Sequence, residues 1–168
     1  MAFSGGRARD PGAAPQASAR DKALDLLARR PHFRRELEKK LAARGYPEAE
    51  VAVTLDRLVA DGLLDDASTA ADFVDSKLRR GGIGSRRLRS DLTGRGVEPD
   101  AAAEALKQLP PEEELLQARA AAERWLRNRS LAEERDRAAL ARFLERRGFG
   151  LPIVYRILRE AGGTEVLD

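Results

Sequence analysis

One pattern of residues occurs three times along this chain of 168 residues. Each copy has two leucines four residues apart, an Arg-Gly pair followed by an apolar residue, and two further apolar residues four apart. The copies are Leu37, Leu41, Arg44, Gly45, Tyr46, Val51 and Leu55; Leu88, Leu92, Arg95, Gly96, Val97, Ala102 and Leu106; and Leu140, Leu144, Arg147, Gly148, Phe149, Val154 and Leu158. The repeated glycines lie 51 and 52 residues apart. A period near fifty residues predicts three copies of one structural unit, arranged as an array.

Each copy predicts a helix, a glycine stop and a second helix. Leucines four apart stack on one helix face. A glycine after the last turn supplies the positive φ that commonly ends a helix. Second helices are expected at 47–61, 98–109 and 152–161, each with a proline near its start, and a further helix is expected before each pair, at about 20–30, 66–80 and 112–128. Ala, Leu, Arg and Glu dominate and period-2 alternation is absent, so the pattern favours helices throughout.

The predicted fold is therefore all-α, with three tandem three-helix repeats of the helix-turn-helix kind in an elongated, curved array. The expected boundaries are a disordered tail over 1–19, repeats over 20–64, 65–110 and 111–162, and a short tail over 163–168. One repeat buries little core, so each is expected to lean on its neighbour.

Composition excludes several classes of function. The chain has no cysteine, which excludes disulfides and thiolate metal sites, and it has a single histidine. No stretch approaches the length of a membrane span, and residues 1–19 lack the apolar run of a secretory signal. We find no nucleophile motif and no metal-ligand spacing, so we expect no enzyme, no cofactor and no metal, and a monomer in the cytoplasm.

Charge is distributed unevenly. The chain carries a net charge of only +3, yet residues 77–95 contain seven basic residues against Asp91 alone. An acidic stretch follows, with six acidic residues against one lysine over 98–114. We name as candidate partner-binding or nucleic-acid-binding residues, and call the basic edge, the set Lys77, Arg79, Arg80, Arg86, Arg87 and Arg89. A second basic stretch over 29–44 is diluted by glutamates and is the weaker candidate.

The basic edge brackets the segment Gly81-Gly82-Ile83-Gly84-Ser85. We expect a helix stop, a loop, and Ser85 as the N-cap of the next helix. Arg86 and Arg89 should point away from the core leucines of that helix. Exposed amides at its start would then combine with the guanidinium groups to attract phosphates or carboxylates.

Other conspicuous polar residues have structural explanations. Arg44, Arg95 and Arg147 each fall in a last helical turn, where a cation meets free carbonyl groups and the negative end of the helix dipole. His32 follows a proline at a helix start, so we expect capping or a surface position. The pair Asp65–Asp66 precedes a helix, which favours N-capping.

The chain resembles the RecX family, the regulatory proteins that modulate the RecA recombinase, over roughly residues 20–162. The motifs that carry the resemblance are Arg44-Gly45-Tyr46, the run from Leu58 to Asp66, Ala71-Asp72-Phe73-Val74, Leu78-Arg79-Arg80-Gly81, and Gly84-Ser85-Arg86-Arg87-Leu88 with Leu92. The chain departs from the family at Leu63 and Thr69, where aromatic residues are common. The resemblance implies a curved body of tandem repeats that binds RecA and its nucleoprotein filament on single-stranded DNA, in the filament groove. It implies inhibition of recombinase, ATPase and coprotease activities in DNA repair, recombination and the SOS response, with direct DNA contact in some members.

Two further interpretations stay open. The first is a helix-turn-helix DNA-binding transcriptional regulator, since three-helix modules can present a recognition helix. Against it, the second helices at 47–61 and 98–109 carry more acidic than basic residues. The second is an enzyme, which would need a catalytic constellation that the residues do not offer.

Overall fold

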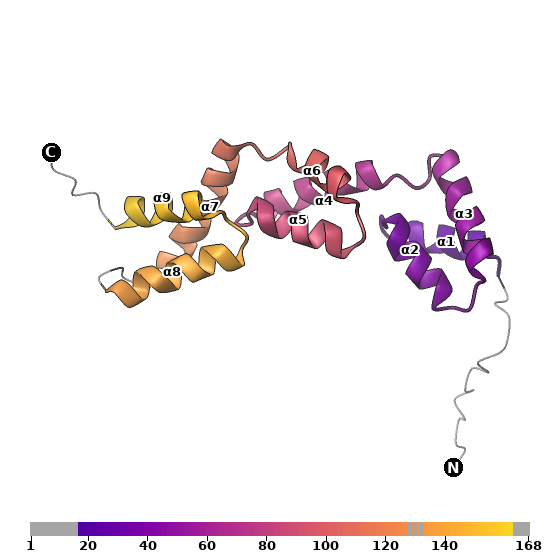
Figure 1. The fold of residues 1–168 in the computed structure, drawn as a ribbon, viewed down its shortest axis with the longest axis horizontal. Coiled ribbons are helices and arrows are strands. Elements are labelled where there is room, and N and C mark those ends of the chain that lie inside the picture. The colour runs from indigo at the N-terminus through magenta and orange to yellow at the C-terminus, as the bar shows by residue number, and fades with distance from the viewer. Residues whose placement is uncertain (1–16, 128, 130, 132, 163–168) are drawn as a thin grey trace, which may run out of the picture. The chain divides into compact units, whose positions relative to one another are not determined.

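Helices make up most of the chain. The computed structural model describes residues 17–127, 129, 131 and 133–162, and within these ranges it contains helices and no strand. The helices are α1 (Ala19–Leu27), α2 (Arg34–Ala42), α3 (Glu48–Ala60), α4 (Asp66–Arg80), α5 (Ser85–Gly94), α6 (Pro99–Leu106), α7 (Pro111–Leu126), α8 (Glu134–Arg146) and α9 (Leu151–Ala161) (Figure 1). They fall into three successive groups of three, so the all-α fold with tandem three-helix repeats is confirmed. No helix in the described ranges is long and apolar enough to cross a membrane.

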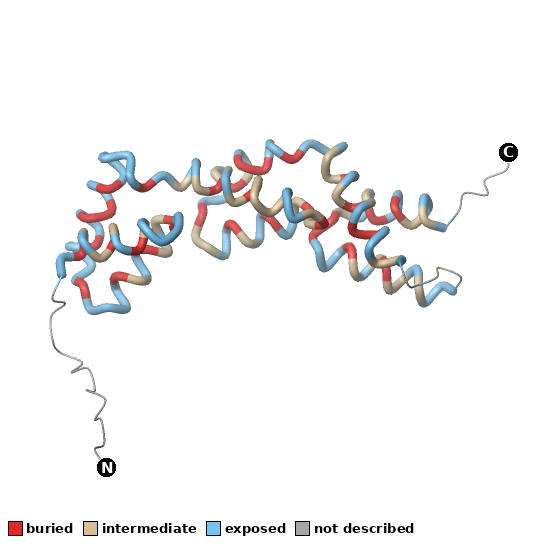
Figure 2. Tube along the Cα trace, turned by 180° about the vertical axis from the view of Figure 1, so that it is seen from behind, coloured by how far each residue is buried: buried red, intermediate tan, exposed pale blue. Residues whose placement is uncertain are grey.

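The chain divides into two compact units, Met1–Asp65 and Asp66–Asp168. In the first unit, α1, α2 and α3 all pack against one another. Leucines from each helix close its core, and Tyr46 and Val51 complete it. Buried and exposed residues alternate along all three helices, as expected for amphipathic helices around one thin core (Figure 2).

The second unit contains two of the three-helix groups. In the group α4–α6, α4 and α5 both pack on α6; in the group α7–α9, α7 and α8 both pack on α9. The second of these groups has its own core, built around Leu140, Leu144 and Phe149.

The repeated residues occupy equivalent places. The leucine pairs of α2, α5 and α8 are all fully buried, at 0% exposure. Each such leucine contributes about 2–5 kcal/mol to stability relative to alanine. Gly45, Gly96 and Gly148 have φ of 86°, 90° and 89°, so each ends its helix in the left-handed region as predicted. One repeat position differs, because in α9 the more deeply buried residue is Ile157 and its neighbour Leu158 is only partly buried.

Helix positions agree with the sequence pattern within a few residues. The prolines expected near the starts of the second helices occupy the N-cap of α3, the first position of α6 and the second position of α9. α4 begins at Asp66, which places Asp65 immediately before it.

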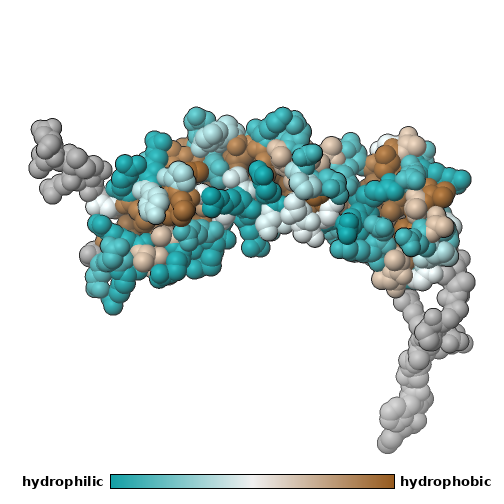
Figure 3. All heavy atoms as spheres, in the orientation of Figure 1, coloured by the Kyte–Doolittle hydropathy of each residue, from teal (hydrophilic) through white to brown (hydrophobic). Residues whose placement is uncertain are grey.

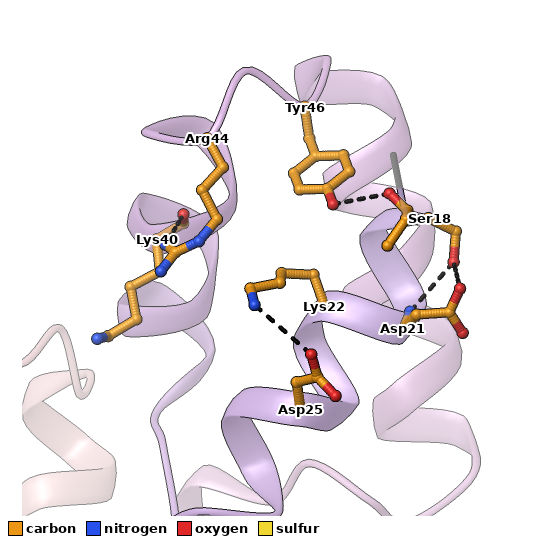
Figure 4. A network of polar contacts seen from close by, with 8 residues as sticks. Ser18, Asp21, Lys22, Asp25, Lys40, Arg44 and Tyr46 are labelled. Carbon is orange, nitrogen blue, oxygen red and sulfur yellow. Dashed lines mark hydrogen bonds and ion pairs between the residues drawn. The ribbon is translucent and has the colours of Figure 1, made fainter. Parts of the chain in front are cut away.

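Two expectations at the start of the first unit are wrong. The predicted disordered tail includes Ala19, yet this residue begins α1 and is fully buried, and Ser18 caps the helix by accepting from the backbone N–H of Asp21. Tyr46 anchors the same segment by donating from its hydroxyl to the carbonyl oxygen of Ala17 at 2.8 Å (Figure 4). The rest of that tail and the C-terminal tail, residues 1–16 and 163–168, lie outside the described residues.

His32 is buried, at 2% exposure, and neither caps a helix nor lies on the surface. Its Nδ1 lies 2.9 Å from the carbonyl oxygen of Arg30, and because a carbonyl can only accept, Nδ1 carries the proton. Burial lowers the pKa of His32 below its ordinary value, since the charged imidazolium is poorly solvated there.

Candidate partner-binding surface

The basic edge lies on two consecutive helices of the second unit. Its first three residues are in the last turn of α4, and the other three are in the first two turns of α5. The five arginines are exposed and Lys77 is partly buried. Leu88 and Leu92 fill the core, whereas Arg86 and Arg89 on the same helix are exposed.

Half of the basic edge is paired with neighbouring carboxylates. Asp91 lies between two cations, 2.9 Å from Nε of Arg87 and 3.7 Å from Nζ of Lys77. Arg79 pairs with Asp75, one turn earlier on α4. Lys77 also lies over the ring of Phe73, with its Nζ 5.2 Å from the ring centroid.

The other half is uncompensated. Arg80, Arg86 and Arg89 make no ion pair within the part of the chain that the structure describes. A count of charges over residues 77–95 does not show which basic residues are paired. Asp75 lies outside that stretch, and Asp91 pairs with residues of both α4 and α5. The available cationic surface is therefore three arginines rather than six basic residues.

The expected N-cap at Ser85 is wrong. Gly84 is the N-cap of α5, and Ser85 is the first helical residue. The backbone N–H of Ser85 donates to the carboxylate of Glu114 on α7, at 2.8 Å. The amide groups of Gly84 and Arg86 donate to the carbonyl oxygens of Arg147 and Gly148, at 2.9 and 3.1 Å. The first amides of α5 thus donate to groups of the protein itself. The carboxylate that the sequence led us to expect from a ligand at this helix start is supplied by Glu114 of the following repeat.

These contacts join two three-helix groups. We call the contact of residues 81–87 with residues 147–149 the glycine joint. A Cβ atom at Gly84 would lie 2.4 Å from the carbonyl carbon of Gly148, and one at Gly148 would lie 2.2 Å from the backbone nitrogen of Arg87. Only glycine at both positions allows the two backbones to approach this closely.

Gln117 holds the loop on its other side. Its side-chain oxygen accepts from the N–H of Gly82 at 2.7 Å, and its amide nitrogen donates to the carbonyl oxygen of Leu78 at 3.3 Å. Gly81 and Gly82 have φ of 75° and 71°, a conformation that brings these groups toward α7 and that other residues adopt only with strain. Contacts within the protein therefore explain why glycine occupies positions 81, 82 and 84 of this segment.

Two arginines from the third group add charge at the glycine joint. Arg147 donates to the carbonyl oxygen of Gly82 at 2.8 Å, and Arg124 lies so close that its Nη2 would be 2.6 Å from a Cβ at Gly82. Both side chains are exposed and use few of their five N–H donors. Sequence reasoning missed them as neighbours of the basic edge, since nothing in the pattern brings positions so far apart in the chain together.

The recurrent arginines do not share one role. Arg44 donates to the carbonyl oxygen of Lys40 at 2.6 Å, which is the predicted contact with its own helix end (Figure 4). Arg147 instead binds a carbonyl of the preceding repeat, and its guanidinium lies 4.7 Å from the ring centroid of Phe143. Arg95 lies 4.9 Å from the ring centroid of Phe73.

The second basic stretch, in the first unit, is partly neutralised. Arg34 pairs with Asp56 at 2.6 Å, and Arg30 pairs with Glu36 at 3.3 Å. Arg35 and Lys39 remain exposed. It is therefore a weaker cationic surface than its residue count indicates.

An ion cluster links α7 to α9. Arg119 makes two hydrogen bonds of 2.8 Å to the carboxylate of Glu160, and Arg156 adds one of 3.1 Å. The hydrogen bonds from Arg119 lower the pKa of Glu160 to about 2, so the carboxylate is ionised at neutral pH. Trp125 is partly buried against the core of the same group, where its ring lies 6.3 Å from that of Phe143.

Among the described residues, no group of three or more acidic, histidine or cysteine side chains could hold a metal ion. Hydrophilic residues predominate on the face of the molecule drawn in Figure 3, with hydrophobic residues visible between them. The fold defines a class: all-helical proteins built from tandem three-helix repeats.

Comparison with known proteins places the chain within that class. Residues 19–58 match the family model for the first three-helix domain of RecX, and residues 65–106 match that for the second. The chain belongs to the RecX family.

Proteins named "Regulatory protein RecX" are similar over most of their length. That of Chromohalobacter salexigens is 40% identical, over 87% of this chain and 94% of its own. That of Halorhodospira halophila is 44% identical, over 82% and 84%. That of Thermus thermophilus is 41% identical, over 83% and 92%.

Solved structures agree on the fold. The crystal structure of RecX from Lactobacillus salivarius has a TM-score of 0.78 at 21% identity, covering 86% of this chain and 94% of that one. Another crystal structure of regulatory protein RecX has a TM-score of 0.75 at 27% identity, covering 84% and 70%. Relatives over this span are named as regulatory proteins, not as enzymes.

Proposed function

We propose that this protein binds RecA and its nucleoprotein filament on single-stranded DNA, in the filament groove. It inhibits the recombinase, ATPase and coprotease activities of RecA in DNA repair, recombination and the SOS response, and acts in the cytoplasm as a monomer. Membership of a family of regulatory proteins supports a regulatory role. The named partner rests on the resemblance to RecA modulators.

The observation that carries the proposal is the uncompensated half of the basic edge. Arg80, Arg86 and Arg89 are exposed and make no ion pair among the described residues, so their donors are available to phosphates or carboxylates. A nucleoprotein filament offers both groups along one surface.

A transcriptional regulator of the helix-turn-helix kind is the alternative, and the charge of the last helix in the first two groups speaks against it, whereas α9 in the third group carries two arginines against one glutamate. α6 carries Asp100 and Glu104 and no basic residue. α3 carries Glu48, Glu50 and Asp56 against Arg57. A helix that enters a DNA groove meets phosphates on both sides, which disfavours these compositions.

The test is RecA-driven ATP hydrolysis on single-stranded DNA while the protein is titrated in. The parent should inhibit, and the double variant Arg86→Ala, Arg89→Ala should require about tenfold more protein for the same inhibition, because charge-assisted hydrogen bonds are lost. Its melting temperature should hardly change, since exposed substitutions usually alter stability by less than about 0.5 kcal/mol.

The double variant Arg142→Ala, Arg146→Ala is the charge-matched control. Both residues lie on α8, are exposed, and make no ion pair in the described ranges. It should inhibit like the parent. Equal inhibition by the parent and the Arg86, Arg89 double variant would remove the basic edge from the proposal, and no effect of the parent on ATP hydrolysis would refute the function itself.

A further inference from the structure

The outer face of α9 carries an aromatic side chain that the fold does not use. Tyr155 is 61% exposed, whereas the other aromatic residues of the described chain are buried or partly buried. Its hydroxyl group has no hydrogen-bond partner among the described residues. An aromatic ring exposed to water contributes little to folding, so contact with another molecule would explain an aromatic residue at this position.

Tyr155 lies in line with two further exposed residues. Leu151, Tyr155 and Arg159 are spaced by four, so they form one stripe with about 6 Å between successive positions. The opposite side of α9 holds Val154 and Ile157 in the core. The stripe therefore faces solvent along the whole helix.

Of the two arginines next to Tyr155 on α9, one is paired with a carboxylate and the other is not. Arg156 is held by Glu160 at 3.1 Å, and Arg119 binds the same carboxylate. Arg159 has no ion-pair partner in the described part of the chain. One unpaired guanidinium thus stands one helical turn from the exposed ring.

A second unpaired guanidinium approaches from α5. A Cβ at Gly150, the residue before α9, would lie 3.8 Å from Nη2 of Arg86. The basic edge therefore continues, within the second unit, onto the start of α9. We call Arg86, Leu151, Tyr155 and Arg159 the α9 face.

We propose that the α9 face binds single-stranded nucleic acid. One base stacks on the ring of Tyr155 beside the Leu151 side chain, and Arg86 and Arg159 contact backbone phosphates on either side. Stacking on an aromatic ring between cations is the chemistry by which proteins hold single strands without reading sequence. A duplex keeps the faces of its bases stacked on one another, so it cannot offer a base to the ring.

This inference deepens the proposed function, since a RecA filament would supply the strand. The chemistry of the α9 face does not require RecA. Charge complementarity favours nucleic acid as occupant, because unpaired guanidinium groups lie near the start of α9, from Arg86, and in its last turn, from Arg159.

The experiment is fluorescence anisotropy of a labelled single-stranded oligothymidylate, and of a duplex of equal length, with the full chain at low salt. Tyr155→Ala should weaken single-strand binding about tenfold. Tyr155→Phe, which keeps the ring, should stay within about twofold of the parent on the same reasoning. Duplex affinity should be nearly unchanged by both. The matched control is Leu116→Ala, an exposed apolar residue on α7 at 54% exposure, which should bind like the parent.

Salt titration tests the cations separately. Arg159→Gln should lower the slope of log affinity against log salt on single strands by about 0.7, the value for one phosphate contact. Arg156→Gln should lower it less, because that guanidinium is already paired with Glu160. Melting temperatures of all variants should match the parent, since these side chains are exposed.

Three outcomes would overturn the inference. Tyr155→Ala could bind the single strand as tightly as the parent, or lose single-strand and duplex affinity equally. It could also keep single-strand affinity while losing inhibition of RecA, which would assign the α9 face to a protein partner. If instead the parent binds single strands in a manner dependent on Tyr155 yet leaves RecA-driven ATP hydrolysis unchanged, the proposed function fails and the α9 face stands.

Discussion

A methyl group at Gly84 would collide with the backbone of the next repeat. The Cβ of an alanine there would lie 2.4 Å from the carbonyl carbon and oxygen of Gly148 and 2.5 Å from the nitrogen of Phe149. These atoms belong to the main chain, so they cannot rotate away as a side chain would. Gly84 has a φ of −97°, which alanine adopts without strain, and the whole effect of Gly84→Ala therefore comes from this contact.

The expected loss of stability can be worked out from the contacts at stake. Inserting a carbon into a tightly packed site costs about 1–3 kcal/mol. Separating the backbones also breaks the hydrogen bonds from Gly84 to Arg147 and from Arg86 to Gly148, each worth about 0.5–1.5 kcal/mol. We expect Gly84→Ala to destabilise the second unit by about 2–6 kcal/mol.

Urea denaturation followed by circular dichroism measures this loss, and hydrogen exchange of the α5 and α8 amides locates it. Gly94→Ala is the matched control, because Gly94 is helical and a Cβ there meets nothing within 4 Å. That change should stabilise the protein by about 0.5–1 kcal/mol, since alanine is the better helix former. If Gly84→Ala is as stable as the parent, α5 and α8 do not dock through these backbones.

Two predictions concern pH. Because burial lowers the pKa of His32, the unfolded chain binds a proton more readily, and the urea midpoint of the first unit should fall as pH drops from about 7.5 to about 5.5, through the unfolded pKa of 6.5. His32 is the only histidine, so His32→Asn should abolish this fall; persistence of the fall in the variant would assign it elsewhere. The pKa of Glu160 is lowered to about 2, so its contribution is present above its ordinary value of 4.5 and is lost as pH falls toward 2. Glu160→Gln should lower the free energy of unfolding by at most about 1 kcal/mol at neutral pH, because the pair with Arg119 is partly exposed. Below pH 2 the substitution should have no effect on stability, since the carboxylate is then protonated in the parent as well. A loss of stability that is independent of pH would contradict the ionic explanation.

The helices were predictable because their signals are local. Leucines four apart mark the buried faces of α2, α5 and α8, and the repeated glycines mark their ends. The expected first helix of the middle repeat, 66–80, coincides with α4. Residues whose environment depends on neighbouring elements were harder: the sequence around His32 favours a surface or cap position, yet the residue is buried.

The candidate surface was predictable only in outline. Exposure of Arg86 and Arg89 followed from the burial of Leu88 and Leu92 on the same helix. The cap of α5 did not follow, because Glu114 comes from a helix that begins 26 residues after Ser85. Tyr155 does not stand out in the sequence either, since an aromatic residue in an apolar stretch is typical of a core until its neighbours are placed.

The glycine joint has a consequence for how this surface can change. Its closest contacts join main-chain atoms, and the main chain is the same whatever side chains it carries. Arginines around the joint, apart from Arg147 with its hydrogen bond to Gly82, can therefore be exchanged for other residues with little effect on how the two repeats fit together. The packing of the two repeats and the charge of the surface around the joint are therefore largely independent. Substitutions on this surface can change what the protein binds while the arrangement of the helices stays the same.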